Sequence, residues 1–381
     1  MQEIEFGRRL ESALEAGDQR SAEFADLDGF YVIWTGELFR GTKYFLKANY
    51  DRLLKDNPRF LGLLVGPYAP AADGPYASLP RVTAEEFLAE RATRRVGLIQ
   101  FFTTRFEAAF WASLRPYTMS FISGLDAMGA AHTYVPVRAE RDFIRANIAR
   151  YADMMTRFED EGSCRMLSAR LQGIAALDTE PMMQNNVPPA YQYFNSLSRD
   201  YSLLLRDRED LIDVGASWGD YVVKFFDEVK DVANSTVNAF EPNAKEFAPL
   251  KTIEAFLPVT AHNTIVSDVT GTGYFHTQLE NIGGSHIAET GSEADIRPTV
   301  RLDDACEKAT LIKIDAEGAE PKILRGAERL LSNPDCRLAS CVYHYPGDLF
   351  ETVDIMAQYG RTRLSFRQYG ASMYDAMVYF D

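Results

Sequence analysis

The amino-acid sequence predicts an α/β protein in which two α/β domains flank a helical bridge. Short apolar segments alternate with amphipathic ones from Gly29 onward, and a second, longer alternation begins near Leu211. Between them, residues 138–177 have a helical pattern throughout. Strands that alternate with helices form parallel sheets with helices on their faces. We therefore expect a smaller amino-terminal α/β domain at 1–137, a helical bridge at 138–208 and a carboxyl-terminal α/β domain at 209–381.

Composition limits the class of protein. The chain has 381 residues, 46% of them apolar and 12% aromatic, which is enough to build sizeable cores. At about 150 residues per domain, its length suggests two or three domains. The formal charge of −15 argues against a nucleic-acid partner, because a phosphate backbone requires a basic surface.

No targeting or membrane segment is expected. The first twenty residues are charged and amphipathic, unlike a signal peptide, and no apolar run approaches the ~20 residues of a membrane span. Cys164, Cys306, Cys336 and Cys341 are far apart and form no CxxC pair. This usage fits a reducing compartment, so we expect a cytoplasmic protein.

The first alternation predicts a small parallel sheet. An amphipathic helix is expected at 1–20, and Thr83 is expected to cap the helix at 83–91. The other expected elements are strands at 30–36, 59–66, 95–102 and 118–125, and helices at 40–56 and 105–114.

The second alternation predicts a longer sheet that closes with an antiparallel pair. Strands are expected at 211–215, 236–242, 259–268, 309–315 and 337–345, and the final pair at 361–369 and 376–380. Helices are expected at 218–229, at 243–256 with Asn243 as the N-cap, and at 319–332 with Pro321 in the first turn.

A glycine turn follows the first strand of this series. Gly215 and Gly219 lie where ligands bind in open α/β sheets, beyond the carboxyl ends of the strands. The sequence GASWG has only two glycines and does not match the GxGxxG motif that binds the pyrophosphate of a dinucleotide. Glu241, followed by Pro242, ends the next strand, where a carboxylate can accept both hydrogen bonds of a ribose diol. Together these features favour a nucleoside without pyrophosphate, such as S-adenosylmethionine, over a purely structural turn.

Longer motifs carry a family resemblance. "IDVGASWGDY", "AFEPN", "VRLDDA", "LIKIDAEGAEPKILRGAERLL" and "VYHYPGDL" follow one another as in FkbM-type methyltransferases, and the sequence resembles that family over roughly its last half. One departure is Ser217, where the family more often has asparagine. The resemblance implies a class I methyltransferase fold, Rossmann-like with a seven-stranded sheet, and S-adenosylmethionine-dependent O-methylation.

The resemblance also implies cofactor-binding residues. The methionine part of S-adenosylmethionine would face the turn, and Glu241 would hold the ribose. The turn residues concerned are Asp213, Gly215, Ala216, Ser217 and Gly219. The adenine edge would be read after the third strand, at Ser267 and Asp268, although Asp268 is equally well explained as an ordinary turn acid.

Three residues at the carboxyl ends of the central strands are candidate catalytic groups. Asp315 ends the fourth strand, Glu317 follows it, and His344 ends the fifth. Asp315 is interpreted as a group near the methyl rather than a simple helix cap. The ordinary pKa of histidine, near 6.5, would suit His344 as a general base, and a structural role is as plausible. Lys313 is interpreted as a snorkelling side chain.

Other acidic and aromatic residues leave alternatives open. Asp303 and Asp304, with Asp315 and Glu317, could ligate a metal, but no spacing requires one and none is assigned. Arg367 and Tyr369 are either acceptor anchors or part of a surface strand. The acceptor is expected to be a small molecule or a glycan, and Tyr343 and Tyr345 would shape its pocket.

The first domain resembles the Rossmann-like amino-terminal domains of some FkbM-type enzymes. Its turn, "WTGELFRGTKYF", contains Gly36 and Gly41 but lacks GxGxxG. We interpret it as a degenerate nucleotide domain that serves acceptor recognition or homodimer contacts. Two alternatives stay open: an oxidoreductase-like protein that binds a nucleotide sugar or NAD through this domain, and a noncatalytic scaffold.

Overall fold

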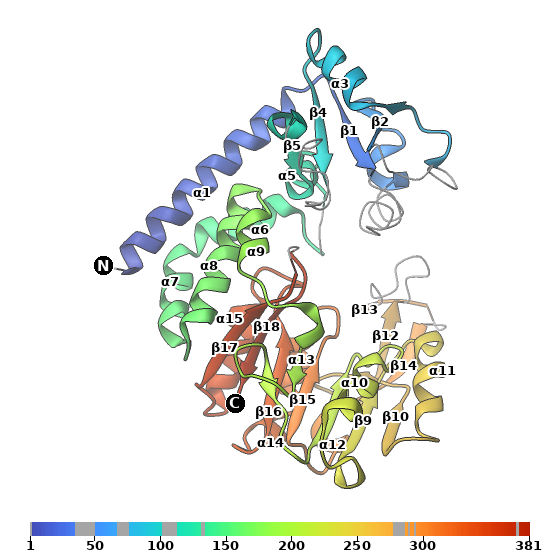
Figure 1. Ribbon diagram of the computed structural model, residues 1–381. Coiled ribbons are helices and arrows are strands. Elements are labelled where there is room, and N and C mark those ends of the chain that lie inside the picture. The colour runs from blue at the N-terminus through green and yellow to red at the C-terminus, as the bar shows by residue number, and fades with distance from the viewer. Residues whose placement is uncertain are drawn as a thin grey trace. The chain divides into compact units, whose positions relative to one another are not determined.

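The computed structural model describes residues 2–34, 50–66, 76–100, 113–130, 134–276, 286–288, 290–292, 295–370 and 373–381. It divides into two compact units, which are coloured by residue number in Figure 1. The amino-terminal unit contains residues 1–148 and 171–181, and the carboxyl-terminal unit contains 149–170 and 182–381. The residues 138–208, expected as a bridge, are therefore shared between the two units.

The amino-terminal unit is built on five parallel strands in the order β3-β2-β1-β4-β5. The strands are β1 (Gly29–Trp34), β2 (Phe60–Val65), β3 (Arg81–Val82), β4 (Val96–Gln100) and β5 (Thr118–Ser120). The helical elements are α1 (Gln2–Ala25), η1 (Tyr50–Leu54), α3 (Ala84–Arg91), η4 (Arg115–Tyr117), α5 (Phe121–Ala127) and α6 (Val137–Ala146). The helices predicted at 40–56 and 105–114 lie largely outside the described residues, as do Gly36 and Gly41.

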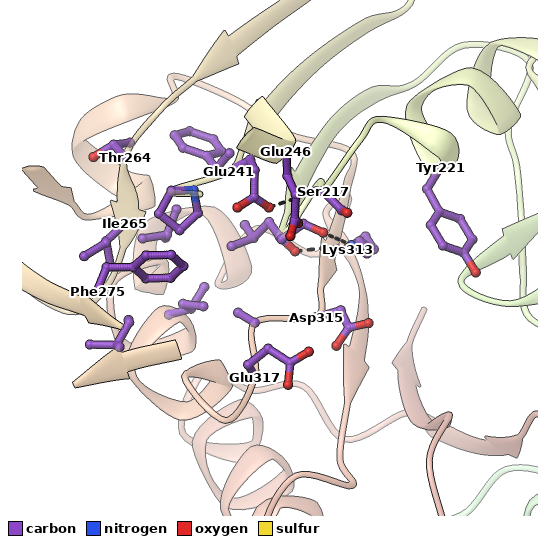
Figure 2. Close-up of a pocket in the computed structure, with 18 of the residues that line it drawn as sticks. Ser217, Tyr221, Glu241, Glu246, Thr264, Ile265, Phe275, Lys313, Asp315 and Glu317 are labelled. Atoms are coloured by element: carbon purple, nitrogen blue, oxygen red, sulfur yellow. Dashed lines mark hydrogen bonds between the residues drawn. The ribbon is translucent and has the colours of Figure 1, made fainter. Parts of the chain in front are cut away.

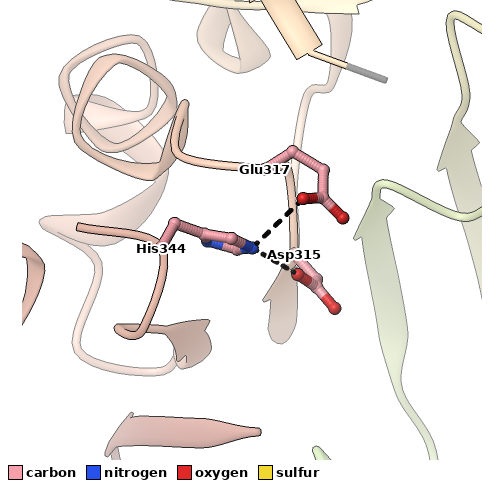
Figure 3. A group of neighbouring side chains, drawn as sticks. All are labelled: Asp315, Glu317 and His344. Atoms are coloured by element: carbon pink, nitrogen blue, oxygen red, sulfur yellow. Dashed lines mark ion pairs between the residues drawn. The ribbon is translucent and has the colours of Figure 1, made fainter. Parts of the chain in front are cut away.

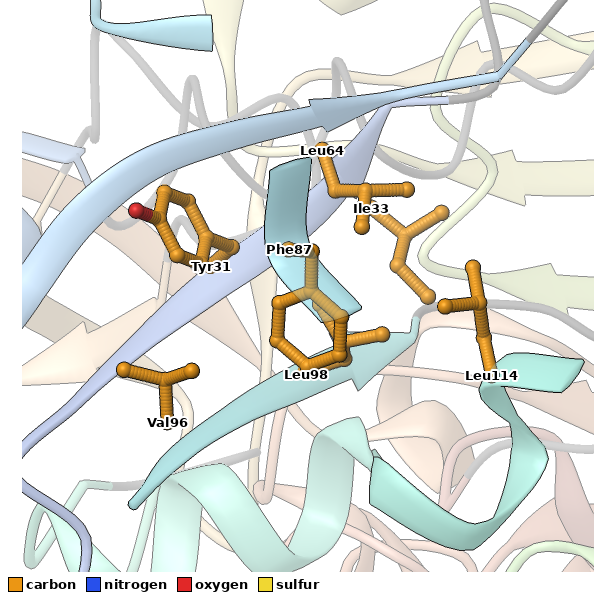
Figure 4. Packing of buried hydrophobic residues seen from close by; sticks show 7 residues of the cluster. All are labelled: Tyr31, Ile33, Leu64, Phe87, Val96, Leu98 and Leu114. Carbon is orange, nitrogen blue, oxygen red and sulfur yellow. The ribbon is translucent and has the colours of Figure 1, made fainter. Parts of the chain in front are cut away.

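Alternating side chains give this sheet its core. Tyr31 and Ile33 of β1 and Val96 and Leu98 of β4 point to one face, where they pack with Phe87 of α3 (Figure 4). Leu64 and Leu114 complete the cluster. The alternation follows from the two-residue period of a strand.

One prediction in this unit is confirmed in detail and another is partly wrong. Thr83 caps α3 through a capping box, in which its hydroxyl accepts from the Glu86 amide and the Glu86 carboxylate accepts from the Thr83 amide. The strand expected at 118–125 ends at Ser120, because this residue caps α5 and turns the following apolar run into a helix. A short apolar run does not distinguish a buried strand from a buried helix.

The carboxyl-terminal unit contains the expected seven-stranded sheet, in the order β10-β9-β8-β15-β16-β18-β17. The last strand, β18, is antiparallel to both of its neighbours, and the other pairs are parallel. The strands are β8 (Asp210–Val214), β9 (Thr236–Phe240), β10 (Val259–His262), β15 (Leu311–Ile314), β16 (Arg337–Cys341), β17 (Leu364–Gln368) and β18 (Ala376–Phe380). The predicted α/β class and the antiparallel closing pair are confirmed.

Helices connect the strands of this sheet along the chain. They are α10 (Asp220–Glu228), η6 (Val232–Asn234), α11 (Ala244–Ile253), α12 (Leu302–Ala305), α13 (Glu320–Arg325), α14 (Glu328–Leu331) and α15 (Asp348–Gln358). Asn243 caps α11 as predicted, because its side chain accepts from the Lys245 amide. The helix expected at 319–332 is instead divided into α13 and α14 near Gly326, where a Cβ would lie 2.2 Å from the Ser267 carbonyl oxygen.

The strand expected at 259–268 also divides. After β10 the Asn263 amide donates to the carbonyl oxygens of Glu241 and Pro242, and the chain leaves the main sheet. It continues as β11 in a second sheet of order β11-β14-β12-β13. The strands of this sheet are β11 (Ile265–Val266), β12 (Gly271–His276), β13 (His286–Ala288) and β14 (Ile296–Val300).

The segment that precedes the seven-stranded sheet is helical and then irregular. Its elements are α7 (Ile148–Arg157), α8 (Glu161–Ala176), α9 (Glu180–Gln184), η5 (Pro189–Tyr191), β6 (Phe194–Asn195) and β7 (Leu203–Leu204). Among the helices of the described ranges, none is long and apolar enough to cross a bilayer.

Arg367 and Tyr369 hold this segment against the sheet. The buried Arg367 guanidinium binds Asp160 and Ser163 and donates to the Asp200 carbonyl oxygen. The Tyr369 hydroxyl is fully buried and bonds to the Tyr201 carbonyl oxygen. Both are internal contacts, so the alternative that these residues form a surface strand is wrong.

Candidate active site

The glycine turn adopts a backbone that requires glycine. Gly215, Ser217 and Gly219 have φ values of +73°, +47° and +87°. A Cβ on Gly215 would lie 1.7 Å from the Asp315 carbonyl oxygen, so the turn passes directly against the end of β15. This approach brings the ends of β8 and β15 together and opens the space beyond them.

Glu241 is placed beside the turn by β9. Its carboxylate accepts from the backbone amides of Ser217, at 2.9 Å, and Asn243, at 2.7 Å. Burial raises the pKa of Glu241 to about 7, against the opposing effect of these two donors. The two amides fix the carboxylate in one orientation, and a carboxylate has further lone pairs for a ligand.

Lys313 and Asp213 form a buried ion pair beneath the turn. Their Nζ and Oδ1 atoms are 2.9 Å apart, and the side chains are only 2% and 1% exposed. Lys313 also donates to the Gly215 carbonyl oxygen at 2.7 Å. Burial would lower the pKa of Lys313, but the Asp213 carboxylate outweighs it and raises that pKa. The interpretation of Lys313 as a snorkelling side chain is therefore wrong.

A cavity of about 280 Å³ lies where these elements meet (Figure 2). Its apolar wall combines the main sheet with the second sheet and α13, and is formed by Phe240, Ile265, Val266, Phe275, Ile287 and Ile323. Its polar wall includes Gly215, Ser217, Glu241, Lys313, Asp315 and Glu317. Glu241 points into this cavity from one side, and Asp315 and Glu317 lie on another (Figure 2).

Not every expected site residue lines the cavity. Gly215, Ser217, Glu241, Pro242, Asp315 and Glu317 do, whereas Asp213, Ala216, Gly219, Ser267, Asp268 and His344 are not among its lining residues. Asp213 forms an ion pair with Lys313, which does line the cavity. The Ser267 hydroxyl donates a hydrogen bond to the Asp268 carboxylate. Within the segment 259–268, which was expected as the third strand, the residues that line the cavity are Thr264, Ile265 and Val266.

Asp315 is held by a tyrosine that sequence reasoning missed. The Tyr193 hydroxyl donates to Asp315 Oδ2 at 2.6 Å, and the Tyr343 hydroxyl contacts Oδ1 at 3.3 Å. Tyr193 is almost fully buried, lines the cavity and has a φ of +68°. Such backbone strain in a bulky residue is often associated with functional sites. The aromatic-rich segment "PAYQYF" was the one signal available in the sequence.

His344 lies beside Asp315 and Glu317, and its imidazole points toward both carboxylates (Figure 3). Its Nε2 is 3.6 Å from both Asp315 Oδ1 and Glu317 Oε2, and its Nδ1 is 3.1 Å from Glu320 Oε1. Burial would lower the pKa of His344, but Glu320, Asp315 and Glu317 outweigh it and raise that pKa to about 10. This pKa lies above the ordinary value near 6.5 on which the role of His344 as a general base was based.

The same carboxylates form groups that could hold a metal ion. Asp315, Glu317 and His344 each place one donor atom within 4.8 Å of the others, and Glu320, His344 and Asp348 form a second such group. Asp303 and Asp304 belong to neither: Asp303 accepts from the amides of α14, and Asp304 from Thr270.

Comparison with known proteins identifies the domain. Residues 213–373 match the sequence model of the methyltransferase FkbM domain. This part of the chain is an FkbM methyltransferase domain. The match extends from Asp213, in the first strand of the main sheet, to Met373, shortly before the last. The expected family and the expected methyltransferase class are thus confirmed for the FkbM domain.

One solved structure agrees with the fold along nearly the whole chain. A crystal structure of the methyltransferase FkbM from Methylobacillus flagellatus KT superposes with a TM-score of 0.74 at 18% sequence identity, covering 98% of this chain and 99% of that chain. The precorrin-6y C5,15-methyltransferase of Geobacter metallireducens GS-15 gives 0.29 at 13% identity, covering 46% and 83%. No functionally curated protein matches the sequence.

Proposed function

We propose that the FkbM domain binds S-adenosylmethionine and transfers its methyl group to a hydroxyl of a saccharide or secondary-metabolite acceptor. The observation that carries the proposal is the buried Glu241 carboxylate, which the glycine turn and the Asn243 amide hold in the cavity. A carboxylate fixed at this strand end suits a ribose diol. The cavity, at about 280 Å³, is close to the lower end of the range for small-molecule sites, about 300–1,000 Å³.

The lining residues fit the parts of this cofactor. Because Gly215 has no Cβ, the turn packs directly against the Asp315 backbone, and the Gly215 backbone lines the cavity. The apolar wall of Ile265, Val266 and Phe275 suits an adenine ring. This placement moves the expected adenine contact from Ser267 and Asp268 to the residues that precede them.

The acceptor side would be formed by Asp315 and Glu317. In methyl transfer the acceptor oxygen bonds to the methyl carbon while the carbon–sulfur bond breaks, and the electrons of that bond stay on sulfur. The hydroxyl proton must leave to a base, and positioning of the two reactants supplies much of the rate. Asp315 is the carboxylate held most firmly for this role, by Tyr193.

No observation favours the oxidoreductase alternative. The turn on which it depended, residues 34–45, lies almost wholly outside the described residues. The scaffold alternative predicts no ligand in the cavity, and one titration therefore separates it from the proposal. The role of the amino-terminal unit in acceptor recognition or dimer contacts is part of the same proposal.

Calorimetric titration with S-adenosylhomocysteine tests the function without knowledge of the acceptor. We expect one saturable site per chain with micromolar affinity at pH 8. NADH, titrated in parallel, should give no saturable heat and no change in fluorescence. Absence of binding by S-adenosylhomocysteine from the folded chain would remove the proposal.

The raised pKa of Glu241 predicts a pH dependence of nucleoside binding. Ribose hydroxyls donate to the ionised carboxylate, so binding must remove the proton that Glu241 carries below its pKa of about 7. The affinity for 5′-methylthioadenosine, which lacks the titrating amino-acid part, should fall about tenfold between pH 8 and pH 6 and change little above pH 8. Calorimetry at fixed ionic strength measures it. The Glu241→Gln variant should lose this pH dependence, and an equal slope in that variant would exclude Glu241 as its source.

A further inference from the structure

Carboxyl groups outnumber basic groups in the cluster around His344. Four carboxyl groups adjoin this one imidazole, those of Asp315, Glu317, Glu320 and Asp348. Glu320 is fully buried, and within the described residues its Oε2 has no hydrogen-bond partner. Lys313, a buried cation whose charge also acts on Asp315, is paired with Asp213. Buried carboxylates in excess of their cations are costly, so the cluster favours an additional positive charge.

The distances within the cluster are somewhat longer than those between ligands of one ion. His344 Nε2 lies 3.6 Å from one oxygen of Asp315 and 3.6 Å from one oxygen of Glu317, longer than a nitrogen–oxygen hydrogen bond. Ligands about 2.1 Å from a metal ion at tetrahedral or octahedral angles are about 3.0–3.4 Å from one another. The three donor atoms lie within 4.8 Å of one another, so a contraction of this group would place them around a single cation.

Glu320 orients the imidazole for such a role. Its Oε1 lies 3.1 Å from Nδ1, and this pairing turns Nε2 toward Asp315 and Glu317. A carboxylate on the far nitrogen is the usual support of a metal-bound histidine. The Glu320 side chain is itself fixed, because the same oxygen accepts from the Ala316 amide at 2.8 Å.

We propose that Asp315, Glu317 and His344 form a divalent-cation site at the floor of the cavity, with Glu320 as the positioning residue of His344. The two carboxylates suit a hard divalent cation, and the added imidazole favours Mn²⁺ over Mg²⁺. Asp315 and Glu317 line the cavity, so the cation faces the same space as Glu241.

The role of the cation rests on the proposed function. An alcohol is a weak acid, and a carboxylate is a poor base for it unless the hydroxyl is made more acidic. A cation bound to the acceptor oxygen lowers the pKa of that hydroxyl and fixes its position. Vicinal hydroxyl groups, as in a saccharide, offer two oxygens for such a contact.

Mn²⁺ binding tests the site without an acceptor. Free Mn²⁺ has a six-line paramagnetic resonance spectrum that is lost on binding, so titration of the full chain gives stoichiometry and affinity. We expect one tight Mn²⁺ per chain. Asp315→Asn and Glu317→Gln, which keep the side-chain shape, should each weaken it at least tenfold. Glu317 is only partly buried, so its variant should fold normally.

Asp304→Asn is the matched control, because it removes an exposed carboxylate outside the cluster. Its Mn²⁺ affinity should equal that of the unmodified chain. Absence of stoichiometric Mn²⁺ binding, or equal affinity in all four proteins, would overturn the cation site. S-adenosylhomocysteine titrated into the same samples separates the two proposals. Nucleoside binding without Mn²⁺ removes only the cation site, and Mn²⁺ binding without the nucleoside removes only the proposed function.

Discussion

Gly215→Ala should destabilise the FkbM domain by more than about 4 kcal/mol, in the range reserved for severe steric or backbone conflicts. The new Cβ would lie 1.7 Å from the Asp315 carbonyl oxygen, and the backbone φ of +73° is itself unfavourable for alanine. The new Cβ would clash with backbone atoms at the end of β15, and backbone cannot move away as the end of a flexible side chain can. Urea unfolding followed by tryptophan fluorescence measures the loss.

Gly360→Ala is the control for the backbone conformation alone. Gly360 follows α15 with a φ of +77°, and a Cβ there would meet no atom within 4 Å. The substitution should therefore cost only about 1–2 kcal/mol, the cost of the left-handed conformation. Equal losses at the two positions would contradict the close approach of the turn to β15, because backbone conformation would then explain both.

Glu241→Ala should weaken S-adenosylhomocysteine binding at least about 100-fold, since two hydrogen bonds to a charged acceptor contribute about 1.5–3 kcal/mol each. The alanine also removes the acceptor for the Ser217 and Asn243 amides, which loosens the turn. Calorimetry at pH 8 measures the change. Glu241→Gln keeps one acceptor oxygen and should show a smaller loss.

Asp227→Asn provides the matched control for Glu241. It removes an exposed carboxylate of α10 in the same domain, away from the cavity lining, and should leave the affinity unchanged. If Glu241→Ala folds and binds as tightly as Asp227→Asn, the ribose assignment fails. Thermal unfolding of each variant shows whether a lost affinity reflects the site or the stability of the domain.

Local sequence patterns were sufficient for most of the fold. The order of strands and helices followed from the two-residue period of strands and the 3.6-residue period of helices. The N-caps at Thr83 and Asn243 followed from side chains that accept hydrogen bonds from amides two or three residues further on. The antiparallel closing pair was also predicted. The elements that differed depend on contacts far along the chain: Gly326 interrupts a helix because it passes close to Ser267, and Asn263 ends β10 because its amide reaches the β9–α11 connection.

The candidate site was predictable only in part. Gly215, Ser217, Glu241, Asp315 and Glu317 were expected near a ligand, and the structure brings them to one cavity. Tyr193 could not be placed, because its partner Asp315 is 122 residues away and no spacing links them. The charge state of His344 also depends on carboxylates contributed by several segments, whose convergence the sequence does not show.

The structure of the chain with S-adenosylhomocysteine bound tests the central claim most directly. The account predicts both ribose hydroxyls within hydrogen-bond distance of the Glu241 carboxylate, the adenine against Ile265 and Phe275, and the sulfur open toward Asp315. A nucleoside bound elsewhere, or one whose ribose does not contact Glu241, would contradict it.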